Sequence, residues 1–196
     1  MNREAIFTAP NLISLLRICL IPVVVSFLFS SNRLSSLLAA LFFSIAAFTD
    51  WLDGYLARRK NVVTTLGKYL DPIADKLLVA VALIMLISLD RVESWIVMLI
   101  VGRELAVTSL RFMAATNGIV IESTQLGKIK TTLQIIATIF LILHYEYFSL
   151  DIQAMGKVFL WLALVATLWS GVDYFYRFFR RMKGRQAASG MPARKK

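Results

Sequence analysis

Six apolar stretches constrain what this chain can fold into more than any other feature. They cover about residues 12–30, 35–57, 69–89, 94–115, 129–148 and 155–179. Each is close to the roughly 20 residues of helix that cross a bilayer, and a helix satisfies its own backbone hydrogen bonds in lipid. The sequence predicts an all-α membrane protein with six transmembrane helices. Residues 1–9 are compatible with a short N-terminal interfacial helix.

The composition leaves room for one membrane domain and little else. Of the 196 residues 58% are hydrophobic, and the mean hydropathy is +0.69, which is too apolar for a soluble domain. We predict a single domain over residues 1–183 and a basic, disordered tail over residues 184–196, whose Gly, Ala, Ser, Pro and charged residues cannot form a core. Cys19 is the only cysteine, so an intrachain disulfide and a cysteine metal site are excluded.

The net charge of +10 is concentrated in alternate connections. One side carries Arg58, Arg59, Lys60, Lys68, Lys128, Lys130, Arg177, Arg180, Arg181, Lys183, Arg185, Arg194, Lys195 and Lys196. The other carries only Arg33, Arg91 and Lys157. Positive-inside counting predicts a multi-pass protein of the cytoplasmic (inner) membrane with both termini on the cytoplasmic side. The basic tail then suits anionic membrane lipids as partners, and no nucleic acid is expected.

Four aspartates are clustered where the second and third predicted helices meet. They are Asp50, Asp53, Asp71 and Asp75. In a helix, residues 50, 53, 54 and 57 share one face, and so do residues 67, 71 and 75. The connection between the helices is short and basic, so the two acidic faces are expected to converge near the cytoplasmic boundary.

Converging carboxylates at a membrane boundary need cations. A charged side chain in the bilayer costs roughly 2.5–3.5 kcal/mol on insertion scales, and like charges also repel each other. An all-oxygen site suits Mg²⁺, Mn²⁺ or Ca²⁺ better than Zn²⁺, and four carboxylates can hold two divalent metal ions. The small residues Gly54, Ala57 and Gly67 leave space for a ligand, and Arg58 and Lys60 supply charge for its phosphates.

Two other interpretations of the aspartates remain open. The carboxylates could pair with the nearby cations Arg58, Arg59, Lys60, Lys68 and Lys76, while the glycines pack helices. Alternatively, intramembrane acids could form the cation or proton relay of a transporter. Pairing with the nearby cations does not require four acids on two specified helix faces.

The spacing of these residues resembles the signature of the CDP-alcohol phosphotransferase family. The pattern D-x-x-D-G-x-x-A-R, eight residues, then G-x-x-x-D-x-x-x-D is complete from Asp50 to Asp75. The resemblance implies six transmembrane helices, often a homodimer, and an active site open to cytoplasm and lipid. The reaction it implies is transfer of a CDP-linked phosphoryl group to an alcohol, with release of CMP.

The resemblance also implies roles for individual residues. Asp50, Asp53 and Asp71 correspond to ligands of two divalent cations, Mg²⁺ or Mn²⁺, and Asp75 to the catalytic base with additional metal contact. The residues corresponding to the CDP pocket are Gly54, Ala57 and Arg58, and the neighbouring candidates are Gly67, Asn11 and Arg17. Helix capping by Asn11 and snorkelling of Arg17 explain the last two almost equally well.

Further motifs indicate the acceptor alcohol. Residues 10–17, 69–77, 102–105 and 126–131 resemble the branch of the family that uses CDP-diacylglycerol and glycerol 3-phosphate. Arg103, Arg111 and Lys128 are cations in or near predicted spans, and together they would suit the acceptor phosphate. Arg103 could instead pair with Glu104, and the other two could snorkel to the boundary. Another alcohol such as inositol phosphate remains the alternative acceptor.

The aromatic run near the end of the last apolar stretch is expected to form a belt at the membrane interface. It comprises Tyr174, Phe175, Tyr176, Phe178 and Phe179.

Overall fold

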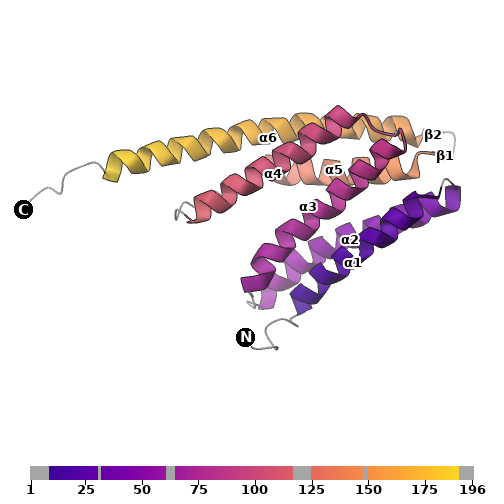
Figure 1. The fold of residues 1–196 in the computed structure, drawn as a ribbon, viewed down its shortest axis with the longest axis horizontal. Coiled ribbons are helices and arrows are strands. Elements are labelled where there is room, and N and C mark those ends of the chain that lie inside the picture. The colour runs from indigo at the N-terminus through magenta and orange to yellow at the C-terminus, as the bar shows by residue number, and fades with distance from the viewer. Residues whose placement is uncertain (1–8, 31, 61–64, 117–124, 148–149, 190–196) are drawn as a thin grey trace, which may run out of the picture.

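The computed structural model describes the whole chain except residues 1–8, 31, 61–64, 117–124, 148–149 and 190–196. The described part contains six helices and one two-stranded hairpin (Figure 1). The helices are α1 (Ala9–Leu28), α2 (Arg33–Lys60), α3 (Thr65–Ser88), α4 (Ser94–Thr116), α5 (Gln125–Leu143) and α6 (Ile152–Ser189). The expected all-α fold is confirmed, and the predicted helix order matches the structure.

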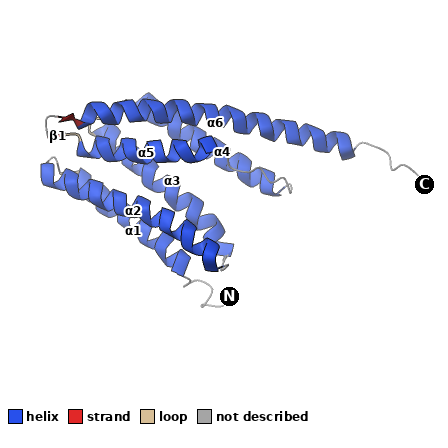
Figure 2. Ribbon diagram, turned by 180° about the vertical axis from the view of Figure 1, so that it is seen from behind, coloured by secondary structure: helices blue, strands red, loops and turns tan. Residues whose placement is uncertain are grey.

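The helices pack as two groups that meet at one end of the molecule. Helix α1 packs against α2 and α3, while α6 packs against α5 and α4. In Figures 1 and 2 the α1–α2 turn and the hairpin lie at the same end, which we call the hairpin end. Two contacts close this end: Arg33 Nη2 donates to Glu146 O at 2.9 Å, and Arg91 Nη1 donates to Ile142 O at 2.9 Å. From there the two groups of helices diverge.

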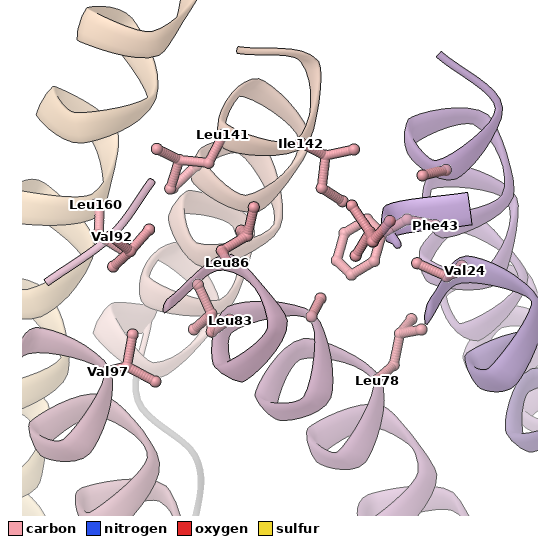
Figure 3. Close-up of a cluster of buried hydrophobic side chains, with 14 of the residues drawn as sticks. Val24, Phe43, Leu78, Leu83, Leu86, Val92, Val97, Leu141, Ile142 and Leu160 are labelled. Atoms are coloured by element: carbon pink, nitrogen blue, oxygen red, sulfur yellow. The ribbon is translucent and has the colours of Figure 1, made fainter. Parts of the chain in front are cut away.

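The apolar core lies where the two groups converge. All six helices contribute to it, and Figure 3 shows several of its side chains in one cluster. One labelled example from each helix, in chain order, is Val24, Phe43, Leu83, Val97, Ile142 and Leu160. Phe43, Leu86, Leu141 and Ile142 are almost completely inaccessible to solvent. Burial of a large apolar side chain contributes about 1.5–3 kcal/mol relative to exposure in water, so this cluster fixes how the helices sit around the site described below.

Two residues with left-handed backbone conformations end helices at the hairpin end. Asp90 (φ 55°) follows α3 and donates its amide to Ile87 O at 3.0 Å, and His144 (φ 33°) follows α5 and donates to Phe140 O at 3.0 Å. A left-handed residue after a helix lets amides bond back to the last carbonyls and stops the helix. Asp90 and His144 therefore set where α3 and α5 stop.

The α5–α6 connection contains a small hairpin that the apolar pattern did not predict. Strand β1 (Glu146–Tyr147) pairs antiparallel with β2 (Leu150–Asp151). Helix α5 consequently ends at Leu143, earlier than the apolar stretch to about residue 148 suggested. Asp151 accepts a hydrogen bond from the amide of Ala154 at 2.9 Å and so caps the start of α6.

Helix ends elsewhere also differ from expectation. Helix α1 begins at Ala9, so Asn11 lies inside it and the prediction that Asn11 caps this helix is wrong. Pro10 is tolerated because the first turn needs no amide donor. The basic residues 58–60 belong to α2 and not to a loop. Helix α6 continues through residues 184–189, where we expected disorder, because Gln186, Ala187 and Ala188 are good helix formers. Residues 1–8, including the expected interfacial segment, and residues 190–196 lie outside the described part.

Within the described residues, one helical stretch is long and apolar enough to cross a membrane by length and composition, Ile152–Met182 in α6. Shorter apolar helical stretches run over Leu15–Leu28, Arg33–Thr49 and Lys76–Ser88.

Candidate active site

A cavity of about 570 Å³ opens where the two groups of helices diverge. Its wall combines Ala47 of α2 and Lys76 of α3 with residues of α4, α5 and α6. Six cationic side chains of the described residues line it: Lys76, Arg103, Arg111, Lys128, Lys130 and Arg177. Among the same described residues, the acidic side chains are Glu104 and Asp173. This excess of positive charge in the described wall favours anions.

The three cations that the sequence assigned to the acceptor phosphate all line this cavity. Arg103 and Arg111 come from α4, and Lys128 comes from α5. Their environments differ: the side chain of Arg103 is only 10% exposed, whereas Arg111 and Lys128 are exposed. The structure therefore brings the three together and places Arg103 deepest.

Arg103 forms an ion pair with Glu104, as the alternative interpretation of this residue expected. Its Nη1 lies 3.0 Å from Glu104 Oε1, and its Nη2 donates to Ser170 Oγ on α6 at 2.7 Å. The Nε atom is buried without a hydrogen-bond partner among the described residues, beside Gly171. A Cβ at position 171 would stand 2.9 Å from that Nε. Glycine at position 171 therefore leaves the space that the arginine stem occupies.

Glu104 also pairs with Lys130 of α5. Lys130 is buried, and a buried ammonium requires such a partner. Next to this pair, Lys76 donates to Thr108 Oγ1, and Thr108 donates to Glu104 O at 2.7 Å. Helices α3, α4, α5 and α6 are thus joined by polar contacts along the inner wall of the cavity.

One face of α6 contributes residues that the sequence interpretation missed. Ser170, Asp173, Tyr174 and Arg177 line the cavity at spacing i, i+3, i+4 and i+7. Arg177 Nε lies 2.9 Å from Asp173 Oδ1. That spacing was visible in the sequence, but the aromatic run and the basic tail hid it.

The aromatic belt is only partly found. Tyr174 and Phe178 are buried against Val107 and Ala114 of α4, whereas Phe179 is exposed. The Tyr174 ring lies 5.8 Å from the Arg111 guanidinium carbon, a cation–π distance. For these two residues the belt interpretation is wrong, because α4 covers their side of α6.

The aspartate motif lies on helical backbone beside the cavity. Asp50 and Asp53 lie in the last part of α2, and Asp71 and Asp75 lie in the first part of α3. Residues 61–64 join these two helices, so the two halves of the motif are close along the chain. Ala47 precedes Asp50 by one turn and Lys76 directly follows Asp75, and both of these neighbours line the cavity.

The side chains of the motif are outside the described residues. This applies to the four aspartates and to Gly54, Ala57, Arg58, Gly67 and Asn11, for which only the helical backbone is described. The chemistry of the donor set fits hard divalent cations, because all four candidate ligands are carboxylates. Arg17, the remaining candidate for the CDP pocket, is 1% exposed, so the snorkelling interpretation is wrong.

The cavity has the chemistry of a site for a phosphorylated ligand. Guanidinium and ammonium groups form charge-assisted hydrogen bonds to phosphate oxygens. Carboxylates, the side-chain type of the neighbouring aspartate motif, are ligands of divalent cations in phosphoryl-transfer sites. A neutral ligand would gain little from this arrangement of charges.

Comparisons with known proteins agree with this chemistry. A family model described as CDP-alcohol phosphatidyltransferase matches residues 7–169. A protein of Bacillus subtilis is 43% identical over 189 residues, which cover 90% of this chain and 98% of that protein. Relatives from Rickettsia felis and Shigella flexneri are 40% and 37% identical and cover 85% and 86% of the chain. All three relatives are named CDP-diacylglycerol–glycerol-3-phosphate 3-phosphatidyltransferase.

Proposed function

This chain belongs to the CDP-alcohol phosphatidyltransferase family, and on that basis we propose that it makes phosphatidylglycerophosphate. It transfers the phosphatidyl group of CDP-diacylglycerol to the 1-hydroxyl of sn-glycerol 3-phosphate and releases CMP. The names of relatives that match nearly their whole length support the reaction. The observation that supports a phosphorylated acceptor is the cation-lined cavity beside the aspartate motif, and the relatives' names support glycerol 3-phosphate in particular.

The acceptor phosphate is assigned to the exposed cations at the cavity mouth. Arg111 and Lys128 are accessible to a ligand, whereas Arg103 is already held by Glu104 and Ser170. We assign direct phosphate contact to Arg111 and Lys128, with Arg103 behind them. Neighbouring cations repel each other, and a bound phosphate offsets this repulsion. A neutral acceptor such as free inositol would not.

The proposal places the chain in the cytoplasmic membrane with six spans. Large apolar side chains are exposed over several helices, including Met98 (71%), Trp169 (69%) and Val172 (72%). Extensive apolar exposure of this kind fits a surface covered by lipid. The charge asymmetry between connections supports cytoplasmic termini and an active site that faces the cytoplasm and anionic lipids. The family resemblance also implies a homodimer, which cross-linking in native membranes would test.

Asp50, Asp53, Asp71 and Asp75 are the residues proposed to hold two divalent cations, Mg²⁺ or Mn²⁺. When bound, such cations supply positive charge that neutralises a pyrophosphate and stabilises charge on the leaving oxygen. The carboxylates keep the cations next to the cavity, and Gly54, Ala57, Arg58, Gly67, Asn11 and Arg17 are proposed to form the CDP pocket.

Asp75 is proposed as the base. It accepts the proton of the 1-hydroxyl of glycerol 3-phosphate while that oxygen bonds to the β-phosphorus of CDP-diacylglycerol. The bond from this phosphorus to the bridging oxygen breaks, and CMP leaves with that oxygen. Arg111 and Lys128 hold the acceptor by its phosphate, which orients its hydroxyl and lowers the entropic cost of the step.

The test is a reconstitution with purified full-length protein in liposomes. CDP-diacylglycerol is supplied with glycerol 3-phosphate, inositol phosphate, glycerol or no acceptor, and products are identified by mass spectrometry. We expect CMP and phosphatidylglycerophosphate with glycerol 3-phosphate only. We also expect EDTA to stop the reaction and Mg²⁺ or Mn²⁺ to restore it.

Three results would contradict the proposal. Preferential product formation with inositol phosphate would show that this family member uses inositol phosphate as its acceptor. Turnover unaffected by EDTA would remove the metal assignment. Metal flux into the liposomes without CMP release would indicate a cation transporter instead.

A further inference from the structure

Glu104 is an acidic side chain at the inner wall of the cavity. Its carboxylate is 16% exposed and pairs with Arg103 of α4 and Lys130 of α5. Asp173, the other acidic residue in the described part of the wall, is 27% exposed and pairs with Arg177 within α6. A carboxylate in an anion-binding cavity opposes binding by its charge alone, so the position of Glu104 calls for a reason.

The reason lies in what its partners contact. Arg103 has Glu104 on one side and Ser170 Oγ of α6, at 2.7 Å, on the other. Lys130 is 9% exposed and makes its ion pair with Glu104. Through Glu104 and Arg103, the cavity walls formed by α4, α5 and α6 are joined.

We propose that Glu104 is a positioning residue for the acceptor's phosphate. It holds the Arg103 guanidinium and the Lys130 ammonium at fixed places behind the phosphate-binding mouth of the cavity. The inference rests on the function proposed above and adds a residue to that same site. Without the carboxylate, two buried cations would repel each other and move apart. The energy of ordering the cavity would then be paid when the acceptor binds.

The charge of Glu104 and its positioning role predict opposite effects on the acceptor. Coulomb's law predicts that removing a negative charge from the cavity strengthens binding of an anion. Positioning predicts weaker binding, because the cations lose their geometry. The sign of the change in KM for glycerol 3-phosphate therefore separates the two explanations.

The experiment compares Glu104→Gln with Glu93→Gln in the full-length protein, reconstituted as above. We expect Glu104→Gln to raise the KM for glycerol 3-phosphate about tenfold, as loss of a charge-assisted contact does. The KM for CDP-diacylglycerol should stay within about twofold. Glu93→Gln removes an equal charge beside the small pocket of the hairpin end and leaves Glu104, Arg103 and Lys130 in place. It should leave the acceptor KM unchanged.

A second variant keeps the test decisive if Glu104→Gln does not fold. Ser170→Ala removes the α6 anchor of Arg103, together with a local hydrogen bond from Ser170 Oγ to Thr167 O within α6, and we expect it to raise the acceptor KM about threefold. A purely structural defect would instead reduce the amount of active enzyme and leave KM unchanged. An acceptor KM that is unchanged or lowered in Glu104→Gln, or in Ser170→Ala when that variant carries the test, overturns the inference. If the unmutated protein makes no phosphatidylglycerophosphate, it is the proposed function that fails.

Discussion

Arg91 and Arg103 are both largely buried arginines, but their surroundings differ. Arg91 lies in the α3–α4 turn at the hairpin end, is 7% exposed, and donates to the carbonyls of Leu141 and Ile142 at 3.4 and 2.9 Å. The pocket beside it is only about 20 Å³. Arg103 is held by two side chains at the wall of a cavity of about 570 Å³.

The difference indicates which cation serves the fold and which serves a ligand. Arg91 meets the last carbonyls of α5, where the helix dipole presents negative partial charge. Backbone carbonyls are a permanent part of the fold, unlike a bound ligand. This contact therefore holds the α3–α4 turn against the end of α5. Arg103 belongs to a group of cations that, among the described residues, outnumber the acids around an open space. Such a group favours the binding of an anion.

The largest effect is expected from Asp75→Asn, next to the cavity. Removal of the proposed base should lower CMP release roughly 10²–10⁴-fold. Metal-dependent binding of CDP-diacylglycerol should remain measurable, whereas Asp53→Asn should weaken both binding and turnover. Glu93→Gln, an acid beside the small pocket of the hairpin end, is the matched control and should change turnover less than about twofold. Equal loss of lipid binding in the two aspartate variants would remove the division of roles.

Cations at the cavity mouth should come next in size. Arg111→Ala and Lys128→Ala should each raise the KM for glycerol 3-phosphate about tenfold, because each loses a charged hydrogen bond to phosphate. Lys157→Ala at the hairpin end removes an equal charge and should have no such effect. Steady-state kinetics with both substrates varied distinguishes these results. A change confined to the KM of CDP-diacylglycerol would place the acceptor elsewhere.

Packing near the hairpin end should affect stability and not the acceptor KM. A Cβ at position 156 would lie 2.9 Å from Leu141 Cγ and 3.0 Å from its backbone nitrogen. Gly156→Ala should therefore cost about 1–3 kcal/mol by overpacking α5 against α6. At Gly102 a Cβ meets nothing within 4 Å, so Gly102→Ala should be neutral or stabilising. Thermal unfolding in detergent measures both, and equal transition temperatures would contradict the close packing.

The smallest effect is expected from Arg91→Met. Loss of the contacts to the α5 carbonyls should lower the free energy of unfolding by about 1 kcal/mol. The kinetic constants for both substrates should match those of the unmutated protein. A rise in the acceptor KM comparable to that of Arg111→Ala would erase the contrast between the two arginines.

The helix order and three of the cations that line the cavity were predictable from the sequence. Apolar stretches of span length gave six helices, and Arg103, Arg111 and Lys128 stood out as cations in or near apolar surroundings. What they contact was not predictable, because Ser170 lies 67 residues from Arg103 in the chain. Such a contact depends on how α4 and α6 pack, which local pattern does not encode.

Helix ends were the weakest part of the sequence interpretation. The left-handed conformation of His144 stops α5 inside an apolar run, and hydropathy does not distinguish an apolar helix from an apolar turn. Tyr174 was assigned to an interfacial belt because its neighbours are aromatic. Its place in the cavity wall follows from its register with Ser170 and Arg177, a signal that composition conceals.

The length of α6 has a consequence for how substrates arrive. Its 38 residues make a rod of about 57 Å, whereas the hydrocarbon interior of a bilayer is about 30 Å thick. A helix that crosses this layer with its first part must carry its last turns into the aqueous phase. A water-soluble acceptor would then meet the basic end of α6 before it reaches the membrane surface, where the lipid substrate CDP-diacylglycerol is located.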